Sequence, residues 1–518
     1  MSKFKNSKES VSSDLYLWND RPTQVAIRDT YSMKIWPITN IFNDGPVNFK
    51  VPEQTKGMLR DLEIVTKLKI RKDGEDLEDL ERGVSVVNNF SNSIWDKVEI
   101  TIDDRVDITQ NMRNVYPYKT LFNHAINFAS NREDYLLYNE LFKMDQGRTK
   151  QLEEESRTFW KWNQELDETF KDMMPETTTN KDDTLELVKE LIWKFNHQIT
   201  GQSLMGVAIA LGGATDDDTQ EKIRPLIDIA WLPTSNTAAS ERSSFINSGK
   251  SVTVNSKLQC PLFNTSKCLP HNMKIRISLT KNTDEFLLLT NEDGYSVFIE
   301  ECYLFATYVY PHDAFLEQID HRLKLEPAPY FISKPELIIK PITSAGRIIR
   351  ITDVFHEKIP AHAFFCLQKS KDFEGSFKTN PYTFIPFKKF QFYIDGTPYF
   401  KDELEVETIN NLGSKGGYEY KGFAAYLRQL YKTIGIDLKG DCLINSKNFI
   451  LNFMVGMSFG ADRSNISENH LNLQKEASTS LEIDMGINTI PEDMILIIYA
   501  LYDRQIQIDS ERKIHIIE

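Results

Sequence analysis

Several side chains in this 518-residue sequence have residue types that could bind a metal ion. His356 and His362 lie six positions apart, and His312 directly precedes Asp313. A metal site on a β-barrel would need a His-x-His or His-x-Asp pair with a distant third ligand, and the sequence contains neither pair. The acidic run 216–218 could hold a hard cation, but it lacks the alternating ligands and the glycine of a calcium loop. We therefore interpret the histidines as loop and rim residues and the acidic run as a solvated loop. The sequence predicts no metal site.

Phosphate-binding and nucleophile motifs are the next chemistry to consider. The glycine-rich stretch 413–417 contains Lys415 but does not match the G-x-x-x-x-G-K-[ST] spacing that wraps a phosphate. Serine, cysteine and histidine residues occur without the local signature of an activated nucleophile. We predict that the protein is not an enzyme, with no catalytic, cofactor-binding or metal-binding residues and no cofactor.

Two tyrosine pairs, Tyr116 with Tyr118 and Tyr418 with Tyr420, could stack on bases or sugars. Each pair stands just before a segment with helical apolar spacing. This duplicated position favours a structural role, in which the tyrosines pack a helix onto the sheet beneath it.

Composition limits the class of partner. The net charge is −14, which argues against a general nucleic-acid binder, because such proteins neutralise phosphates with lysine and arginine. Residues 151–190 carry twelve acidic and five basic side chains, whereas residues 1–8 carry three lysines and no acid, which indicates a basic arm.

The start of the sequence lacks an apolar signal segment, and no stretch approaches the ~18–20 apolar residues of a membrane span. Five cysteines without a C-x-x-C pair indicate reduced, mostly buried thiols.

The order of elements expected in the first half recurs in the second half. An alternating segment, 98–102 or 390–394, ends in a turn at Asp103-Asp104 or Asp395-Gly396. A Tyr-x-Tyr-Lys motif and a segment of helical periodicity follow each time. Each half then closes on a long apolar segment that we interpret as a strand pair. A repeat of this length is too long for a solenoid and predicts two β-domains in tandem.

Short strands bounded by Gly, Pro, Asn and Asp, with few helices, predict antiparallel sandwiches rather than βαβ units. Eight strands in two facing sheets form a jelly roll. The predicted fold class is therefore all-β dominated, with two tandem jelly-roll β-sandwiches, short helices, and a partly helical insertion in the first. The strand signals are at 47–51, 62–71, 98–102, 273–280, 285–289 and 295–310, and then at 347–352, 363–368, 387–394, 449–454, 480–485 and 494–508.

The predicted domains are an N-terminal arm or peripheral strand at 1–42, a first jelly roll at 43–325 and a second at 326–518. A linker marked by Pro327, Pro329 and Pro335 separates the two. The insertion covers about 143–250, because nothing in the second half matches it, and segments 153–170 and 184–195 read as helices. Its acidic balance suits an outer surface rather than one that faces nucleic acid, since like charges repel.

Several segments of the chain resemble a known protein family. The chain resembles the double jelly-roll major capsid proteins of Polinton/Maverick elements and adintovirus-like DNA viruses, which are similar in fold to adenovirus hexon and virophage capsid proteins. The Gly-Ser-x-x-x-Asn-Pro block within 373–384 and the terminal strand from Tyr499 to Asp509 are the most specific segments. The other resembling segments are 43–49, 62–70, 98–103 with 116–121, 262–263, 274–289, 303–316, and 392–396 with 418–431.

The resemblance implies a major capsid protein that forms homotrimeric, pseudo-hexameric capsomers of an icosahedral shell around a double-stranded DNA genome. It implies self-association, penton and minor capsid proteins as partners, and no specific nucleic-acid recognition. The expected location is the virion capsid, with synthesis in the host cytoplasm and nuclear assembly as one option. The insertion would form much of the trimer's outer crown.

Two other classes stay open from the residues alone. A receptor- or glycan-binding β-sandwich protein, such as a viral spike or a lectin-like module, would use the same strand pattern. A metal-dependent enzyme on a jelly-roll barrel would need ligands inside a strand set, and the missing His-x-His pair argues against it.

Overall fold

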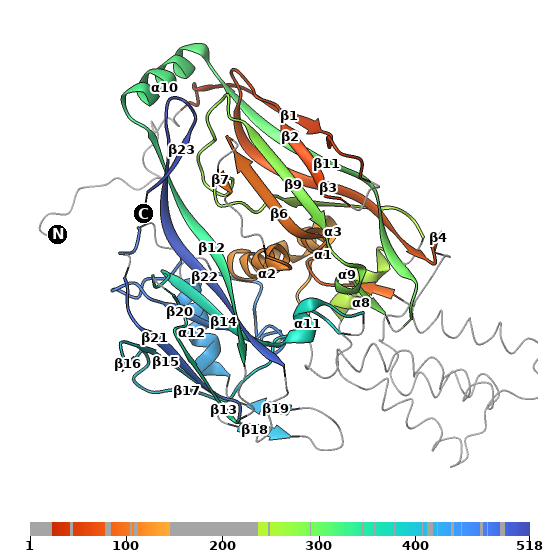
Figure 1. Cartoon of the computed structure of the whole chain (residues 1–518), viewed down its shortest axis with the longest axis vertical. Coiled ribbons are helices and arrows are strands. Elements are labelled where there is room, and N and C mark those ends of the chain that lie inside the picture. Colours follow the sequence, from red (N-terminus) through yellow and green to blue (C-terminus); the bar gives the residue numbers. More distant parts are fainter. Residues whose placement is uncertain are drawn as a thin grey trace, which may run out of the picture.

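Two lobes of antiparallel sheet, one from each half of the chain, make up the computed structural model (Figure 1). The structure describes residues 23–145 and 237–517, apart from gaps at 42–44, 78–83, 104–105, 108–111, 247–248, 291, 343–345, 357, 378, 407, 412–417, 422, 437–439, 447, 467–469, 474 and 487–492. Several predictions fall outside these residues: the basic start of the arm, the helices at 153–170 and 184–195, the acidic run 216–218 and the glycine-rich stretch 413–417.

The first lobe contains two main sheets. One has the order β1 (Ile27–Ile35), β11 (Tyr295–Pro311), β3 (Met58–Lys72) and β4 (Glu75–Asp76), with β8 (Val252–Lys257) also paired to β3. The other has the order β2 (Val47–Val51), β9 (Ile275–Lys281), β6 (Trp95–Ile102) and β7 (Val106–Asp107). A small sheet pairs β5 (Val84–Val86) with β10 (Leu288–Thr290).

The second lobe also contains two main sheets. One has the order β12 (Ala328–Ile342), β22 (Met494–Ile508), β14 (His362–Lys369) and β20 (Val455–Ser458), with β23 (Ile514–Ile517) paired to β22. The other has the order β13 (Ile348–Thr352), β21 (Thr479–Asp484), β15 (Lys389–Ile394) and β16 (Thr397–Pro398), with β17 (Leu404–Glu405) paired to β15. A separate hairpin joins β18 (Thr408–Asn411) to β19 (Tyr418–Lys421).

The two lobes repeat one topology strand by strand. The path β1-β11-β3-β8 corresponds to β12-β22-β14-β20, and the path β2-β9-β6-β7 corresponds to β13-β21-β15-β16. In both lobes the chain passes back and forth between the two sheets in the same order, which is the connectivity of a jelly roll. The predicted fold class, two tandem jelly-roll sandwiches with short helices, is confirmed.

Alternation within the strands explains the two layers. In β3 the side chains of Leu62, Ile64, Leu68 and Ile70 are buried, and charged residues between them face outward. Period-two patterns of this kind place one face of a sheet on a core. The central strand β22 differs, because residues 494–501 are all buried. It is covered on both faces, one of them by the other lobe.

Short helices connect and cover the sheets. α2 follows the β6–β7 hairpin and α12 follows the β15–β16 hairpin and the β18–β19 hairpin, so the predicted strand, turn and helix recur in both lobes. The turns at Asp103 (φ 51°) and Asp395 (φ 48°) adopt left-handed backbone that aspartate tolerates. The described helices are α1 (Phe90–Ser93), α2 (Val115–Asn127), η1 (Ser130–Arg132), α3 (Glu133–Glu140), α8 (Thr237–Ser244), α9 (Asp284–Leu287), α10 (Asp313–Leu325), α11 (Ser370–Glu374) and α12 (Ala424–Ile434).

Three strand predictions were wrong in detail. Residues 284–287 form helix α9 rather than the start of a strand, and residues 449–454 form a series of turns before β20. The long segments that close each half are single strands of 17 and 15 residues, not strand pairs. An apolar run of this length could not be divided correctly from its pattern, because no turn residue inside it marks whether the chain reverses.

The proline-marked linker is also different in the structure. Pro329, Pro335 and Pro341 lie inside β12, which pairs with β22 along its full length. A proline fits a sheet where its missing N–H would point away from the partner, which is possible on an edge strand. The three prolines are six residues apart, so all of them present the same side of β12 to the free edge. Residues 27–35, within the segment predicted as an arm or peripheral strand, form the edge strand β1 of the first lobe.

Candidate functional site: the junction between the two lobes

The histidines singled out as candidate ligands do not converge. His312 is exposed and precedes α10, where Asp313 pairs with Lys56 at 2.8 Å. His356 is exposed beside Asp353, whereas His362 is buried with its Nδ1 3.1 Å from the Ser458 hydroxyl. Within the described residues, no group of three or more His, Cys, Asp or Glu side chains is arranged to hold a metal ion.

The cysteines are placed for packing. Four of the five are buried, and Cys268 is half-buried. Burial raises the pKa of the Cys260 and Cys302 thiols to about 12. Because the thiolate is the reactive form, these two side chains are poor nucleophiles at neutral pH.

The two Tyr-x-Tyr-Lys motifs occupy different elements, contrary to the prediction that both precede a helix. Residues 116–119 form the first turn of α2, whereas Tyr418–Lys421 is strand β19. A structural role does hold for the first motif. The Tyr118 hydroxyl donates a hydrogen bond into the second lobe, where the Gln368 Oε1 and the Pro381 carbonyl are both within reach. Burial raises the pKa of Tyr118 well above its usual value, so the hydroxyl keeps its proton.

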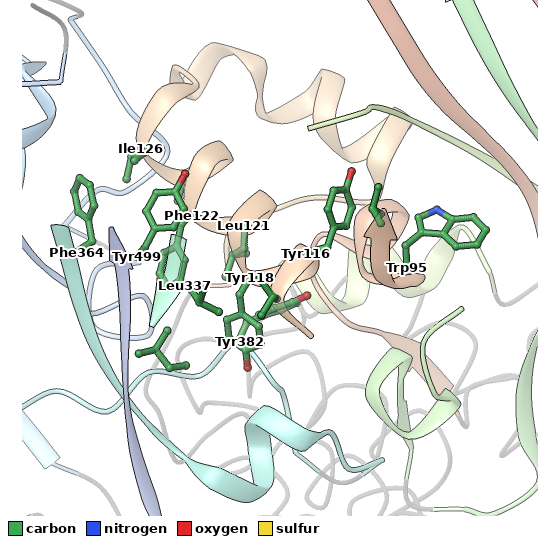
Figure 2. Close-up of a cluster of buried hydrophobic side chains, with 14 of the residues drawn as sticks. Trp95, Tyr116, Tyr118, Leu121, Phe122, Ile126, Leu337, Phe364, Tyr382 and Tyr499 are labelled. Atoms are coloured by element: carbon green, nitrogen blue, oxygen red, sulfur yellow. The ribbon is translucent and has the colours of Figure 1, made fainter. Parts of the chain in front are cut away.

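Helix α2 forms the centre of an apolar junction between the lobes (Figure 2). The Phe122 ring stacks on Phe384 and on Tyr499, with centroid distances of 5.6 and 5.3 Å. Both partners belong to the second lobe, and all three side chains are buried. Figure 2 shows Leu337 and Phe364 of the second lobe on the same side of the helix. Aromatic contacts of this geometry add to the energy of area burial.

Buried polar side chains connect the lobes around this apolar centre. The hydroxyls of Ser93 and Tyr382 lie 2.6 Å apart, and the Asn114 amide donates to the Phe373 carbonyl at 2.7 Å. Such bonds are directional, and a buried polar group left without its partner costs about 1–3 kcal/mol. They therefore fix the orientation of one lobe on the other.

Asp145 is a second polar centre of the junction. Its carboxylate accepts bonds from Arg242 at 2.8 Å and from the Asn380 amide at 3.0 Å, and its carbonyl accepts from Asn452 at 3.2 Å. Asp145 and Arg242 stand at the two ends of the segment predicted as an insertion. The ends of that segment therefore meet at a buried ion pair that is also bonded to the second lobe.

The backbones of the two lobes touch at Gly375. A Cβ at this position would lie 2.7 Å from the Phe286 Cα of helix α9, and Gly375 has φ +95°. Both the close approach and the dihedral require glycine. The neighbouring Phe377 carbonyl accepts a bond from the Thr290 N–H at 2.8 Å.

A cleft of about 260 Å³ opens on the junction, lined by both lobes. Residues of α2 form one wall, including Tyr116, Lys119 and Asn123, and the edge strand β12 contributes Phe331 and Ser333. The lining combines amide, hydroxyl and aromatic groups with the ammonium group of Lys119. The arrangement can fix the two lobes as one body.

Sequence reasoning missed most of the junction. Asn114, Asp145 and Gln368 act through partners more than 200 residues away, and no local pattern announces such contacts. The block around Gly375 and Asn380 was singled out, and both residues lie at the junction. No described helix has both the length and the apolar character to cross a bilayer.

Comparison with known proteins adds the fold family. No family model matches the sequence, and no curated protein matches it. A chain in the cryo-EM structure of the Sputnik virophage is similar in structure, with a TM-score of 0.52 and 11% sequence identity, over 99% of this chain and 93% of that one. The Faustovirus major capsid protein has a TM-score of 0.50 and 7% identity, over 94% of this chain and 92% of that one. At these identities the likeness establishes the fold, and it extends over both lobes: the chain has a double jelly-roll fold of the kind found in viral capsids.

Proposed function

We propose that this protein is a viral major capsid protein, a structural protein rather than an enzyme. The observation that carries the proposal is the fusion of two topologically equal jelly rolls into one body through a buried junction. A spike or lectin made of linked modules needs no such junction, because its modules can act separately. A shell subunit needs fixed lobe geometry, because an error in the angle between lobes would be multiplied across the lattice.

The two-lobed shape supports a homotrimer as the assembly unit. Three copies around a three-fold axis would present six similar lobes, giving a pseudo-hexameric capsomer that tiles an icosahedral shell. The proposed contents are a double-stranded DNA genome, and the proposed partners are other copies of the chain, penton proteins and minor capsid proteins. The proposed location is the virion capsid, after synthesis in the host cytoplasm and with nuclear assembly as one route. Among families of this fold, the sequence resemblance favours the Polinton/Maverick and adintovirus type.

The domain division 1–42, 43–325 and 326–518 is part of the proposal, with the insertion at about 143–250 on the outer end of the first lobe. The acidic composition of residues 151–190 supports an outward position, because a negatively charged genome repels it. The Asp145–Arg242 pair supports a defined point of attachment.

Light scattering after size exclusion tests the assembly unit. We expect a trimer with subunit interfaces above about 2,000 Å² in total, and negative-stain images with pseudo-hexagonal outlines. A stable monomer at micromolar concentration and neutral pH would refute the capsomer and favour a receptor- or glycan-binding module. Limited proteolysis of assembled particles tests the crown, because cleavage within 174–181 and 214–220 should precede loss of the shell.

A further inference from the structure

Arg512, in the turn between β22 and β23, joins the C-terminal hairpin to the first lobe. Its Nε donates to the His271 carbonyl at 3.0 Å, and one terminal nitrogen lies 2.9 Å from the His271 Nε2 and 2.7 Å from the Asp320 Oδ1. His271 lies in the connection from β8 to β9, and Asp320 lies on α10. Figure 1 shows β23 beside α10, at the end of the long β12–β22 ribbon.

The chemistry of arginine fixes the protonation state of His271. A guanidinium has only donors, so the His271 Nε2 must accept and the ring is neutral with its proton on Nδ1. That Nδ1 is buried and has no hydrogen-bond partner among the described residues. The imidazole is therefore held neutral by a cation on one side and has no acceptor for its own proton on the other.

The backbone conformation of Arg512 is consistent with a specific role for its side chain. Arg512 has φ +69°, a left-handed conformation that glycine or asparagine adopts more easily. The side-chain contacts across the lobes give a reason for an arginine at this strained turn position.

The geometry points to an acid-sensitive latch made by Arg512, His271 and Asp320, which holds the C-terminal hairpin on the first lobe at neutral pH and releases it on acidification. A proton on Nε2 would turn the acceptor into a donor and set two cations 2.9 Å apart. The Asp320 Oδ2 is 3.4 Å from the same Nε2, so the charged imidazole competes with Arg512 for Asp320 and leaves the His271 carbonyl as the remaining acceptor of Arg512 on the first lobe.

The sign of the pH dependence follows from the surroundings. Burial and the Arg512 charge lower the pKa of His271, and Asp320 opposes them. Arg512 and Asp320 are the charged groups that act on His271 among the described residues. A histidine with a lowered pKa in the closed state favours that state above the ordinary value of about 6.5. This contribution is lost as the pH falls below that value through the lowered pKa.

Only the hairpin turn is released on acidification, because the neighbouring hydrogen bonds between the lobes do not titrate between about pH 5 and 7.5. The Tyr330 hydroxyl donates to the Cys268 carbonyl at 2.8 Å, and the Lys267 ammonium donates to the Pro329 carbonyl at 2.6 Å. These bonds keep β12 on the first lobe while the hairpin turn opens. The latch belongs to a single chain, so it does not depend on the proposed assembly into a shell.

Hydrogen exchange of peptides that cover 509–517 tests the latch in the full-length protein. The wild type is compared with Arg512→Ala at one pH at a time, which removes the intrinsic pH dependence of exchange. We expect the wild type to exchange about tenfold more slowly than Arg512→Ala at about pH 7.5, the factor expected for a charge-assisted bond. At about pH 5 the two proteins should exchange equally.

Two further variants assign the effect to His271. His271→Asn keeps an acceptor but cannot titrate, so the ratio to Arg512→Ala should be the same at both pH values. His515→Asn is the matched control, because His515 is exposed in the same hairpin and pairs with Asp509 instead. It should retain the wild-type difference between the two pH values.

Equal exchange of wild type and Arg512→Ala at pH 7.5, or a pH step that persists in His271→Asn, would overturn the latch. If His271→Asn does not fold, the wild type and Arg512→Ala still decide, since a ratio that is unchanged at pH 5 overturns the latch.

Discussion

At the scale of single residues, the junction depends on Gly375, a position where a side chain would collide with the other lobe. Gly375 combines a glycine-only backbone, with φ +95° and ψ 140°, with contact to the backbone of the other lobe. Gly396 has φ +72°, but a Cβ there would meet nothing within 4 Å. Substitution of Gly396 by alanine tests backbone strain alone. Substitution of Gly375 tests backbone strain together with the steric clash against Phe286.

We expect Gly375→Ala to destabilise the protein by about 3 kcal/mol or more, because backbone strain and displacement of Phe286 add. Gly396→Ala should cost only about 1 kcal/mol, since left-handed backbone is strained but tolerated there. Chemical denaturation of both variants measures the difference. Equal losses would mean that Phe286 moves aside easily and that the close approach is not a constraint.

His124 is the second residue with a specific expectation. It is fully buried in α2, with its Nδ1 2.6 Å from the Thr120 carbonyl and its Nε2 3.1 Å from the Glu140 carboxylate. Burial opposes the charged ring, but Glu140 and the Thr120 carbonyl outweigh it and raise the pKa of His124. A raised pKa gives a stabilisation that is complete below the ordinary value of about 6.5 and is lost as pH rises through the folded-state value.

The difference in melting temperature between the wild type and His124→Gln should therefore shrink as the pH rises above about 6.5. The absolute loss also includes altered packing, so the pH dependence of the difference is the readout. His312→Gln, at an exposed position, is the control variant. A difference that stays constant over this range would show that His124 is neutral in the folded protein.

At the scale of elements, β12 shows how an edge strand can carry three prolines without losing its ladder. The prolines at 329, 335 and 341 share one parity, and the register with β22 continues through them without a shift. The opposite parity must then supply the N–H groups that bond to β22. The free edge is also blunted, because proline offers no donor to another chain.

This parity predicts opposite outcomes at adjacent positions. Glu336→Pro removes a ladder bond and should cost about 3 kcal/mol, whereas Pro335→Ala should change stability by less than about 1 kcal/mol. Thermal unfolding of the two variants compares them directly. A tolerated proline at 336 would show that the assumed direction of the β12 hydrogen bonds is wrong.

At the scale of the whole molecule, the buried junction couples the two lobes in folding. Phe122 from the first lobe lies between Phe384 and Tyr499 of the second, so neither lobe can unfold without exposing the other's core. Interfaces between independent domains are usually smaller and more polar. The chain should therefore behave as one cooperative unit despite its duplicated architecture.

Calorimetry of the purified subunit should show one unfolding transition in the wild type. Phe122→Ala should lower its midpoint, consistent with a loss of about 3–5 kcal/mol for a buried aromatic side chain, and should not split it. Phe315→Ala, at an exposed position on α10, is the control. Two resolved transitions in the wild type would show that the lobes are energetically independent.

The sequence was sufficient for most of the strands, for the recurrence of strand, turn and helix, and for the fold class, because these depend on local alternation and on turn residues such as Asp103 and Asp395. It failed where local pattern and tertiary context disagree. Residues 284–287 form a helix, although the apolar residues 286–289 favoured a strand. The prolines of β12 were interpreted as a linker, because a sequence does not reveal which strand is at an edge. The Gly375 block was noticed as a resemblance, but its contact with Phe286 was not.

Only the tertiary structure decided the contacts between distant residues. The Tyr118–Gln368, Asp145–Asn380 and His271–Arg512 pairs each join residues separated by more than 200 positions. Periodicity reports which face of an element is buried, not what it is buried against. The junction and the latch arise where the second jelly roll packs against the first, and the physical reason they could not be foreseen is that a non-local contact leaves no mark on the residues between its partners.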